Sequence, residues 1–378
     1  MEQLYHGVNA LLPDGFHRTD VLVADGRIKA VGERLGSGGE DLSGLSLLPG
    51  LVDAHTHGAG GFDFNTANTL ADVRTILDYY AAHGVTSVLA TVMTDTDEAL
   101  CRQLELTAEA ARTMPMIRGI HLEGPFLSHE YKGAMPEEYL QLPDIDAFHR
   151  YQACAGGLIN YITFSPELPG AEDFVRTVSG EGVHVSLGHS GADFATALNC
   201  IAAGAAGFTH TFNAMRPVDH HNASIAVAAL YADAYCEAVL DGKHLAPDIV
   251  RMLCKVKGVD RIIGITDSLA ATGLPNGEYY SGGMRVRVVD GDVRLIATNT
   301  RAGSTLDGLA ALQNASQFTG LPLERAILCL TKTPLTAVGL YDRTGSIEPG
   351  KDADFILLDA DGHLRRTVCR GETVYKAA

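Results

Sequence analysis

Residues 183–210 read VHVSLGHSGADFATALNCIAAGAAGFTH. A β-rich apolar run ends at His189, and a segment of helical character follows it at 192–204. Gly204 is the expected helix stop, and a second β-rich run then ends at His210. A strand, a helix and a strand in this order are typical of a βα unit with parallel strands. The stretch therefore predicts a parallel sheet in which histidines close neighbouring strands.

The same alternation extends in both directions over residues 47–342. Eight β-rich runs end near His55, Met93, Glu123, Ser165, His189, His210, Asp241 and Asp267. Segments of helical character lie at 70–83, 96–114, 145–156, 171–180, 192–204, 224–234, 246–258 and 304–340. Eight strands with interleaved helices predict an α/β fold, a (β/α)8 TIM barrel.

The two ends of the chain have a different pattern. Residues 1–46 contain short β-rich pieces with Asp-Gly turns at 14–15 and 25–26, and residues 343–378 return to the same pattern. Each end is too short to form a sheet domain alone. We therefore predict that both ends form one small β-sandwich domain beside a catalytic barrel at 47–342.

Composition excludes several classes of protein. The chain has 378 residues with 29 Lys+Arg against 46 Asp+Glu, a formal charge of −17, and no basic run longer than two residues, so we expect no nucleic-acid partner. No apolar stretch approaches the roughly 18 residues that cross a membrane. The opening residues 1–7, MEQLYHG, do not resemble a signal peptide, so we expect a cytoplasmic protein. The seven cysteines contain no Cys-x-x-Cys pair, and we expect them to be reduced thiols.

Histidines and one glutamate close several of the predicted strands. His55 and His57 form a His-x-His pair, which on a strand places both imidazoles on one face. Glu123, His189 and His210 end three other runs, whose carboxyl ends converge on one barrel mouth. Each residue alone also fits a core histidine or a surface glutamate. Together they form an oxygen and nitrogen ligand set suited to zinc or a similar divalent ion.

The eighth run ends in Asp267. A carboxylate beside a metal site accepts a proton from water and delivers it to a leaving group, so Asp267 is the candidate general base and acid. The alternative is an aspartate that caps the following segment.

Nine stretches in order carry a resemblance to a known family: PGLVDAHTHG (49–58), HLEGPFLS (121–128), KGAMP (132–136), GHS (188–190), THTFNAM (209–215), LDGKH (240–244), TDSLAATGLP (266–275), AGSTL (302–306) and GSIEPGKDADFILLD (345–359). The chain resembles the amidohydrolase superfamily and, within it, the N-acetylglucosamine-6-phosphate deacetylases. The resemblance covers nearly the whole length and implies a metal-dependent hydrolase of a small amino-sugar substrate, working as a homodimer.

The resemblance also implies roles for single residues. Glu123, His189 and His210 would bind the principal metal, Asp267 would be the catalytic acid and base, and His55 and His57 make a second ion plausible. Zinc is the expected metal, with iron, cobalt or manganese as alternatives. The fourth run has no lysine to bridge two metals, and Glu123 takes that role by analogy. The sugar site would be lined by Ala134, Asn213, Ala214, His221, His244, His121, Ala302, Gly303 and Ser304.

Two positions depart from the family pattern. The family carries an arginine that grips the 6-phosphate eight residues after Asn213, and this chain has His221 there. An imidazole is a weaker substitute for a guanidinium clamp, and Arg216 is the nearest candidate to compensate. Met135 stands where the family commonly has histidine.

The expected reaction is hydrolysis of the N-acetyl amide of N-acetylglucosamine 6-phosphate. Three alternatives stay open: an unphosphorylated or other N-acetylhexosamine as substrate, an N-acyl amino acid or dipeptide as substrate, and a non-catalytic barrel that keeps a zinc site.

Overall fold

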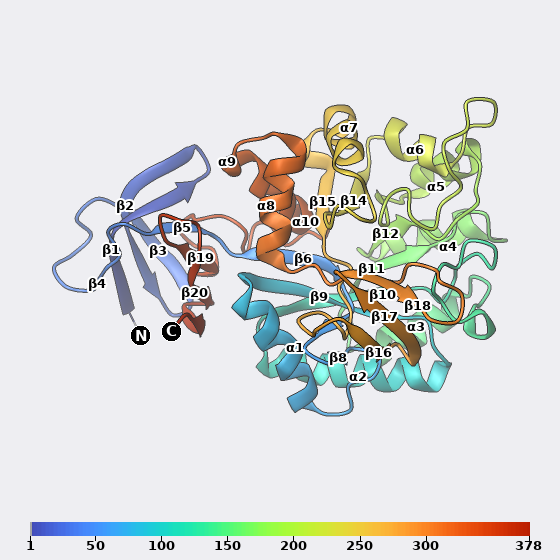
Figure 1. The fold of residues 1–378 in the computed structure, drawn as a ribbon, viewed down its shortest axis with the longest axis horizontal. Coiled ribbons are helices and arrows are strands. Elements are labelled where there is room, and N and C mark those ends of the chain that lie inside the picture. Colours follow the sequence, from blue (N-terminus) through green and yellow to red (C-terminus); the bar gives the residue numbers. More distant parts are fainter. Residues whose placement is uncertain (1) are drawn as a thin grey trace.

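Eight parallel strands form the barrel in this computed structural model, which describes residues 2–378 (Figure 1). In chain order they are β6 (Leu51–Thr56), β9 (Val85–Met93), β10 (Ile117–Glu123), β11 (Ile159–Phe164), β12 (His184–Leu187), β13 (Gly207–Phe208), β14 (Tyr235–Val239) and β15 (Ile262–Ile265). Each pairs with its neighbour in sequence order, so the predicted (β/α)8 barrel is confirmed.

The ends of this strand order, β6 and β15, are joined by polar contacts. The Asp267 backbone N–H donates to the His55 carbonyl oxygen at 2.9 Å. The buried carboxylate of Asp53 accepts the Thr266 hydroxyl at 2.5 Å. These bonds bring the first and last strand ends of the barrel together, which places His55 beside Asp267.

The helices lie around the barrel close to the predicted segments. They are α1 (Leu70–Ala82), α2 (Asp97–Thr113), α3 (Ile145–Cys154), α4 (Ala171–Gly180), α5 (Phe194–Ala203), α6 (Ile225–Tyr231), α7 (Pro247–Lys257), α8 (Gly308–Thr319), α9 (Leu323–Ala326) and α10 (Lys332–Ala337). The single segment expected at 304–340 is wrong, because Gly320, with φ of +72°, and Pro322 end α8 and begin the short helix α9. Within residues 2–378, no helix is long and apolar enough to cross a membrane.

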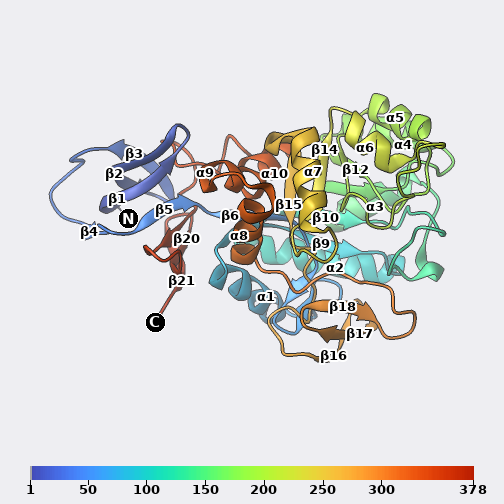
Figure 2. The ribbon, with the colours of Figure 1, turned by 45° about the horizontal axis from the view of Figure 1, so that its top comes forward.

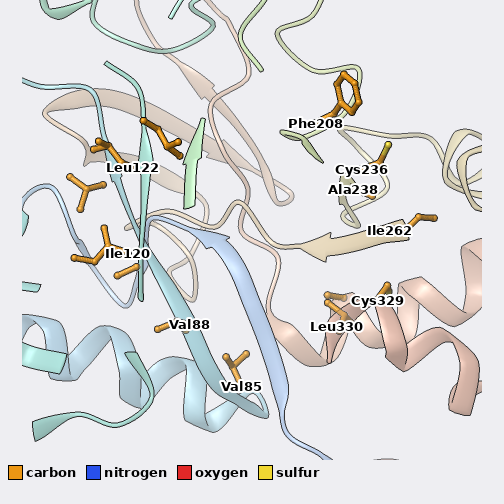
Figure 3. Close-up of a cluster of buried hydrophobic side chains, with 14 of the residues drawn as sticks. Val85, Val88, Ile120, Leu122, Phe208, Cys236, Ala238, Ile262, Cys329 and Leu330 are labelled. Atoms are coloured by element: carbon orange, nitrogen blue, oxygen red, sulfur yellow. The ribbon is translucent and has the colours of Figure 1, made fainter. Parts of the chain in front are cut away.

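Side chains along each barrel strand point alternately outward, toward the helices, and inward, into the barrel, so the core has two parts. In β14, Cys236 and Ala238 point outward into the apolar layer between barrel and helices, where the short 3-10 helix Ile327–Leu330 supplies Leu330 (Figure 3). Val239 belongs instead to the apolar cluster inside the barrel, and the buried Glu237 contacts His55 there. The barrel thus carries a charged side chain in its interior, which requires a partner.

Both ends of the chain meet in a second sheet, with strand order β21-β20-β19-β5-β1-β2-β3 (Figure 1). Its strands are β1 (Glu2–Leu12), β2 (Gly15–Ala24), β3 (Arg27–Gly32), β4 (Glu40–Asp41), β5 (Ser46–Pro49), β19 (Phe355–Leu358), β20 (Leu364–Cys369) and β21 (Glu372–Lys376), with β4 paired to β1. The small domain that we predicted from both ends of the chain, beside the barrel, is therefore confirmed, and its strands form one hydrogen-bonded sheet. The domain limits at 46 and 343 stay predictions, and β5 lies across the first.

A three-stranded antiparallel sheet lies between β15 and α8, where the sequence analysis predicted no element. It consists of β16 (Gly277–Ser281), β17 (Met284–Val289) and β18 (Asp292–Leu295), and Figure 2 shows it as a separate layer beside the barrel. Its turns fall at Gly282-Gly283 and Asp290-Gly291, which are typical hairpin residues. A two-stranded sheet, β7 (Gly58–Ala59) with β8 (Phe62–Asp63), follows β6.

Two cysteines form a disulfide, which corrects the expectation of seven reduced thiols. Cys101 of α2 and Cys154 of α3 are bonded, with their Cα atoms 5.2 Å apart. The two helices pack against each other and bring together residues 53 positions apart in sequence. The sequence holds no spacing signal for this pair.

A buried ion-pair group joins the barrel to the small sheet domain. Arg118 of β10 contacts Asp352 at 2.9 Å and also pairs with Asp354, and all three side chains are at most 5% exposed. Burial raises the pKa of Asp354, which Arg118 partly offsets. We expect Arg118→Met to lower the free energy of unfolding by about 3–5 kcal/mol, because Asp352 and Asp354 lose the buried guanidinium that both contact.

Urea denaturation of Arg118→Met and Arg343→Met measures this difference. Arg343 contacts the same Asp352 at 3.1 Å but is 48% exposed, so its loss should cost about 1 kcal/mol or less. Equal losses in the two variants would contradict the assignment of the buried group.

Candidate metal centre

The carboxyl ends of the barrel strands place the predicted site residues together. Glu123 is the last residue of β10, and His189, His210 and Asp267 follow β12, β13 and β15 within two residues. These last three have left-handed backbones, with φ of +49°, +27° and +51°. Such conformations cost of the order of 1–3 kcal/mol for residues other than glycine, and outside turns they cluster at functional sites.

Glu123, His189 and His210 converge on one point. Glu123 Oε1 lies 3.2 Å from His189 Nε2 and 3.3 Å from His210 Nε2, and the two imidazole nitrogens are 3.1 Å apart. The Nδ1–H groups donate to the carbonyl oxygens of Tyr131 and Asn213, each at 3.1 Å. These bonds leave the Nε2 lone pairs facing the carboxylate, as metal ligands require.

His55 and His57 form a second group around the same glutamate. His55 Nε2 lies 3.4 Å from Glu123 Oε1, and His57 Nε2 lies 3.4 Å from Glu123 Oε2. The two oxygens of Glu123 therefore face different histidines, and this carboxylate is shared by both groups. The bridging role expected for Glu123 stays a prediction, and the position of its two oxygens supports it.

Unpaired polar atoms indicate that the cluster is built for a cation. Among the atoms of residues 2–378, the buried His55 Nε2, His57 Nδ1 and Glu123 Oε2 have no hydrogen-bond partner. Burial disfavours the charged form of Glu123, but His55 and the other histidines hold its pKa well below the usual value. An ionised carboxylate that faces the Nε2 atoms of four histidines fits a divalent metal ion.

Asp267 lies at the edge of this cluster. Its Oδ1 is 3.1 Å from His57 Nε2 and 3.8 Å from His55 Nε2. Burial opposes ionisation, but the hydrogen bond from His57 and the charge of His55 lower the pKa of Asp267 to about 2. The carboxylate is thus ionised at neutral pH.

The buried carboxylate of Glu237, which the sequence analysis missed, accepts a hydrogen bond from His55. Glu237 Oε2 accepts the Nδ1–H of His55 at 3.0 Å and the backbone N–H of His210 at 2.9 Å. Burial opposes its charge, and His55 outweighs that effect, so the pKa of Glu237 is about 2. A lone glutamate inside the apolar stretch 235–239 was the available signal.

We expect Glu237→Ala to weaken metal affinity about 10–100-fold, because a ligand histidine loses the partner that orients it. Equilibrium dialysis against buffered zinc, followed by metal analysis, measures the change. Glu237→Gln is the matched control, since an amide oxygen still accepts both hydrogen bonds. Unchanged affinity in Glu237→Ala would show that Glu237 does not position His55.

A cavity of about 270 Å³ opens above the metal cluster. This volume is just below the roughly 300–1,000 Å³ common for small-molecule sites. Six of the predicted sugar-site residues line it: Ala134, Asn213, Ala214, His244, Ala302 and Gly303. Met135 lines it too, together with Ser281, Met284 and Val286 of the β16–β18 sheet. The sheet that the sequence analysis missed therefore forms part of the cavity wall.

Three predicted sugar-site residues lie elsewhere. His121 is fully buried beneath His55 and contacts the Thr163 hydroxyl at 2.8 Å. Ser304 is buried and donates to the Thr266 carbonyl oxygen at 2.6 Å. His221 is exposed on the loop after Met215, outside the cavity lining, and Arg216 is also absent from that lining.

Comparisons with known proteins agree with this geometry. The amidohydrolase family profile matches residues 46–374. The N-acetylglucosamine-6-phosphate deacetylase of Bacillus subtilis (strain 168) is 33% identical over 87% of this chain and 84% of its own, and that of Bos taurus is 34% identical over 89% and 85%.

A solved structure is similar over its whole length. It is a mutant N-acetyl-D-glucosamine-6-phosphate deacetylase from Mycobacterium smegmatis in complex with N-acetyl-D-glucosamine-6-phosphate. It superimposes with a TM-score of 0.93 at 32% identity and covers 99% of this chain and 100% of its own.

Proposed function

The chain belongs to the amidohydrolase family, and from this we propose that it hydrolyses the N-acetyl amide of N-acetylglucosamine 6-phosphate to acetate and glucosamine 6-phosphate. The observation that carries the proposal is the convergence of Glu123, His189 and His210 with the ionised Asp267 at one cavity. Relatives with 33–34% identity over most of the chain are deacetylases of this substrate.

Glu123, His189 and His210 would hold the principal ion, and His55 and His57 would hold a second ion through the shared Glu123. Zinc suits these ligands, and iron, cobalt or manganese would also bind them. A divalent ion there lowers the pKa of water from about 15.7 toward 7 and polarises a carbonyl oxygen.

Asp267 carries the proton in this mechanism. Its carboxylate takes a proton from the water that attacks the acetyl carbonyl carbon. It then gives that proton to the sugar nitrogen as the carbon–nitrogen bond breaks, so that acetate and a free amine leave. The contact with His57 Nε2 at 3.1 Å holds the carboxylate at the edge of the cluster.

The residues along the cavity would hold the sugar. His244 donates Nδ1–H to Asp241 at 2.7 Å, which leaves Nε2 as an acceptor for a sugar hydroxyl. Asn213 and Ala214 lie three and four residues after His210, and Ala302 and Gly303 precede Ser304, whose backbone N–H donates to the Asp267 carbonyl oxygen at 2.7 Å. His121, His221 and Ser304 lie outside the lining, so we propose no sugar contact for them.

One observation favours a second candidate, an unphosphorylated N-acetylhexosamine. His221 replaces the phosphate-binding arginine of the family and lies outside the cavity lining. Comparing kcat/KM for acetate release from N-acetylglucosamine with and without the 6-phosphate separates the two candidates. We expect at least a tenfold preference for the phosphorylated sugar, since charged hydrogen bonds contribute about 1.5–3 kcal/mol. A preference for the free sugar would establish the second candidate instead.

We also propose a homodimer and a cytoplasmic location. The dimer rests on the family resemblance and on the prevalence of symmetric dimers. Light scattering of the purified protein should give twice the mass of one chain. The Cys101–Cys154 disulfide is unusual for the reducing cytosol, and thiol titration of protein isolated without reductant tests its presence.

A further inference from the structure

The cavity wall holds one basic side chain that no part of the proposed mechanism uses. Among the described residues that line the cavity, Arg301 is the only lysine or arginine. The chain as a whole carries a formal charge of −17, and Glu123 and Asp267 add negative charge at the cavity floor. A substrate with an anionic group therefore needs local positive charge, and Arg301 is its source within the cavity.

Arg301 is held in place by two hydrogen bonds. Its Nε donates to Asp292 Oδ1 at 2.7 Å, and its Nη1 donates to the Lys243 carbonyl oxygen at 2.8 Å. Within residues 2–378, Nη2 has no hydrogen-bond partner, and the side chain is 30% exposed. Because two hydrogen bonds already hold this guanidinium, it would lose little conformational entropy when Nη2 donates to a bound oxyanion.

Arg301 shares its acidic partner with a second arginine. Asp292 also accepts from Arg294 Nε at 2.8 Å, so one carboxylate serves two guanidinium groups. The single negative charge of Asp292 is therefore shared between Arg301, which lines the cavity, and Arg294, which does not.

The backbone connects Arg301 to the reacting end of the cavity. Gly303, two residues further on, packs against the Asp267 carbonyl oxygen, and Ala302 bonds to Val293 of β18 at 3.1 Å. Arg301 lines the same cavity as Glu123, His189 and His210, so one ligand can contact both. The 2-acetamido and 6-phosphate groups lie on opposite sides of a hexosamine ring.

We propose that Arg301 binds the oxyanion on C6 of the substrate sugar, in place of the family arginine whose position His221 occupies. This inference rests on the proposed function, because it assigns the end of the cavity opposite the hydrolysed amide. It makes Arg301 a specificity-determining residue that separates phosphorylated from free N-acetylhexosamines.

The test compares Arg301→Met with Arg294→Met, both assayed on N-acetylglucosamine with a 6-phosphate, a 6-sulfate or no substituent. Arg294 contacts the same Asp292 but does not line the cavity. Arg301→Met should raise KM for the 6-phosphate about 10–100-fold and leave kcat/KM for the free sugar within about twofold. Arg294→Met should change neither, and the 6-sulfate arm shows whether any C6 oxyanion suffices.

Calorimetric titration with glucosamine 6-phosphate keeps the inference separate from the proposed function. Binding should weaken in Arg301→Met and stay unchanged in Arg294→Met, whether or not the enzyme releases acetate. Equal KM values for the 6-phosphate in the two variants, or an equal rise for the free and phosphorylated sugars in Arg301→Met, would overturn the proposal. Absence of acetate release by the wild type would instead count against the proposed function.

Discussion

Replacing Asp267 by asparagine is expected to lower kcat by about 10²–10⁴-fold while bound metal stays in place. The amide has nearly the shape of the carboxylate, so His57, 3.1 Å away, keeps a neighbour of the same size. It cannot take the proton of the attacking water or return it to the sugar nitrogen. Steady-state acetate release, with metal analysis of the same sample, measures both quantities.

The metal analysis is the control for this variant. Equal metal content in wild type and Asp267→Asn shows that only proton transfer has been removed. A kcat within tenfold of wild type would mean that another group carries the proton, and the role of Asp267 would be withdrawn.

Replacing Glu123 by alanine is expected to remove the bound metal and to lower kcat/KM at least about 10³-fold. The two oxygens of Glu123 face different histidines, so both candidate groups lose their common carboxylate. Metal catalysis supplies several kcal/mol, and about 1.4 kcal/mol corresponds to a tenfold change in rate. Metal content per chain and acetate release give the result.

Two further variants make this result specific. Glu167→Gln alters another carboxylate near the barrel mouth, which bonds to Ser190 and Gly191 rather than to the cluster, and it should keep full metal content. His57→Ala should lose the second ion alone. Full metal content in a folded Glu123→Ala variant would contradict the proposed ligand set.

The barrel was predictable because its strand ends are marked by residue type. Seven of the eight apolar runs end at a polar residue near the barrel mouth, as those at Glu123 and His210 do. The ligands come from strands far apart in sequence, but parallel strands bring their carboxyl ends to one side. The fold therefore implied the proximity of these residues before any distance was known.

The sequence predicts which strand residues point into the barrel better than it predicts how deep in the barrel each side chain lies. His121 lies two residues before Glu123 on β10, so both side chains point inward, but His121 lies about 7 Å lower. It therefore packs under His55 instead of reaching the cavity. The position of Glu237 was not predictable either, because a single charged residue inside an apolar strand forms no periodic pattern.

The inserted β16–β18 sheet and the disulfide between two helices were not predictable from the sequence pattern. The β16–β18 sheet lies in the chain between β15 and α8. The βα alternation predicts a helix after β15, so it does not indicate an antiparallel sheet there. The Cys101–Cys154 bond depends on how α2 packs against α3, which spacing along the chain does not encode. Arg301 follows the β16–β18 sheet, so its place in the cavity wall became visible only with the fold.

The most direct test of the central claim is the yield of acetate and free amine from N-acetylglucosamine 6-phosphate before and after metal removal. Metal-loaded protein should release acetate and glucosamine 6-phosphate in equal amounts. Chelation should abolish both products, and added zinc should restore them. Failure of folded, metal-loaded protein to release acetate, or release that continues after complete removal of the metal, would contradict the account.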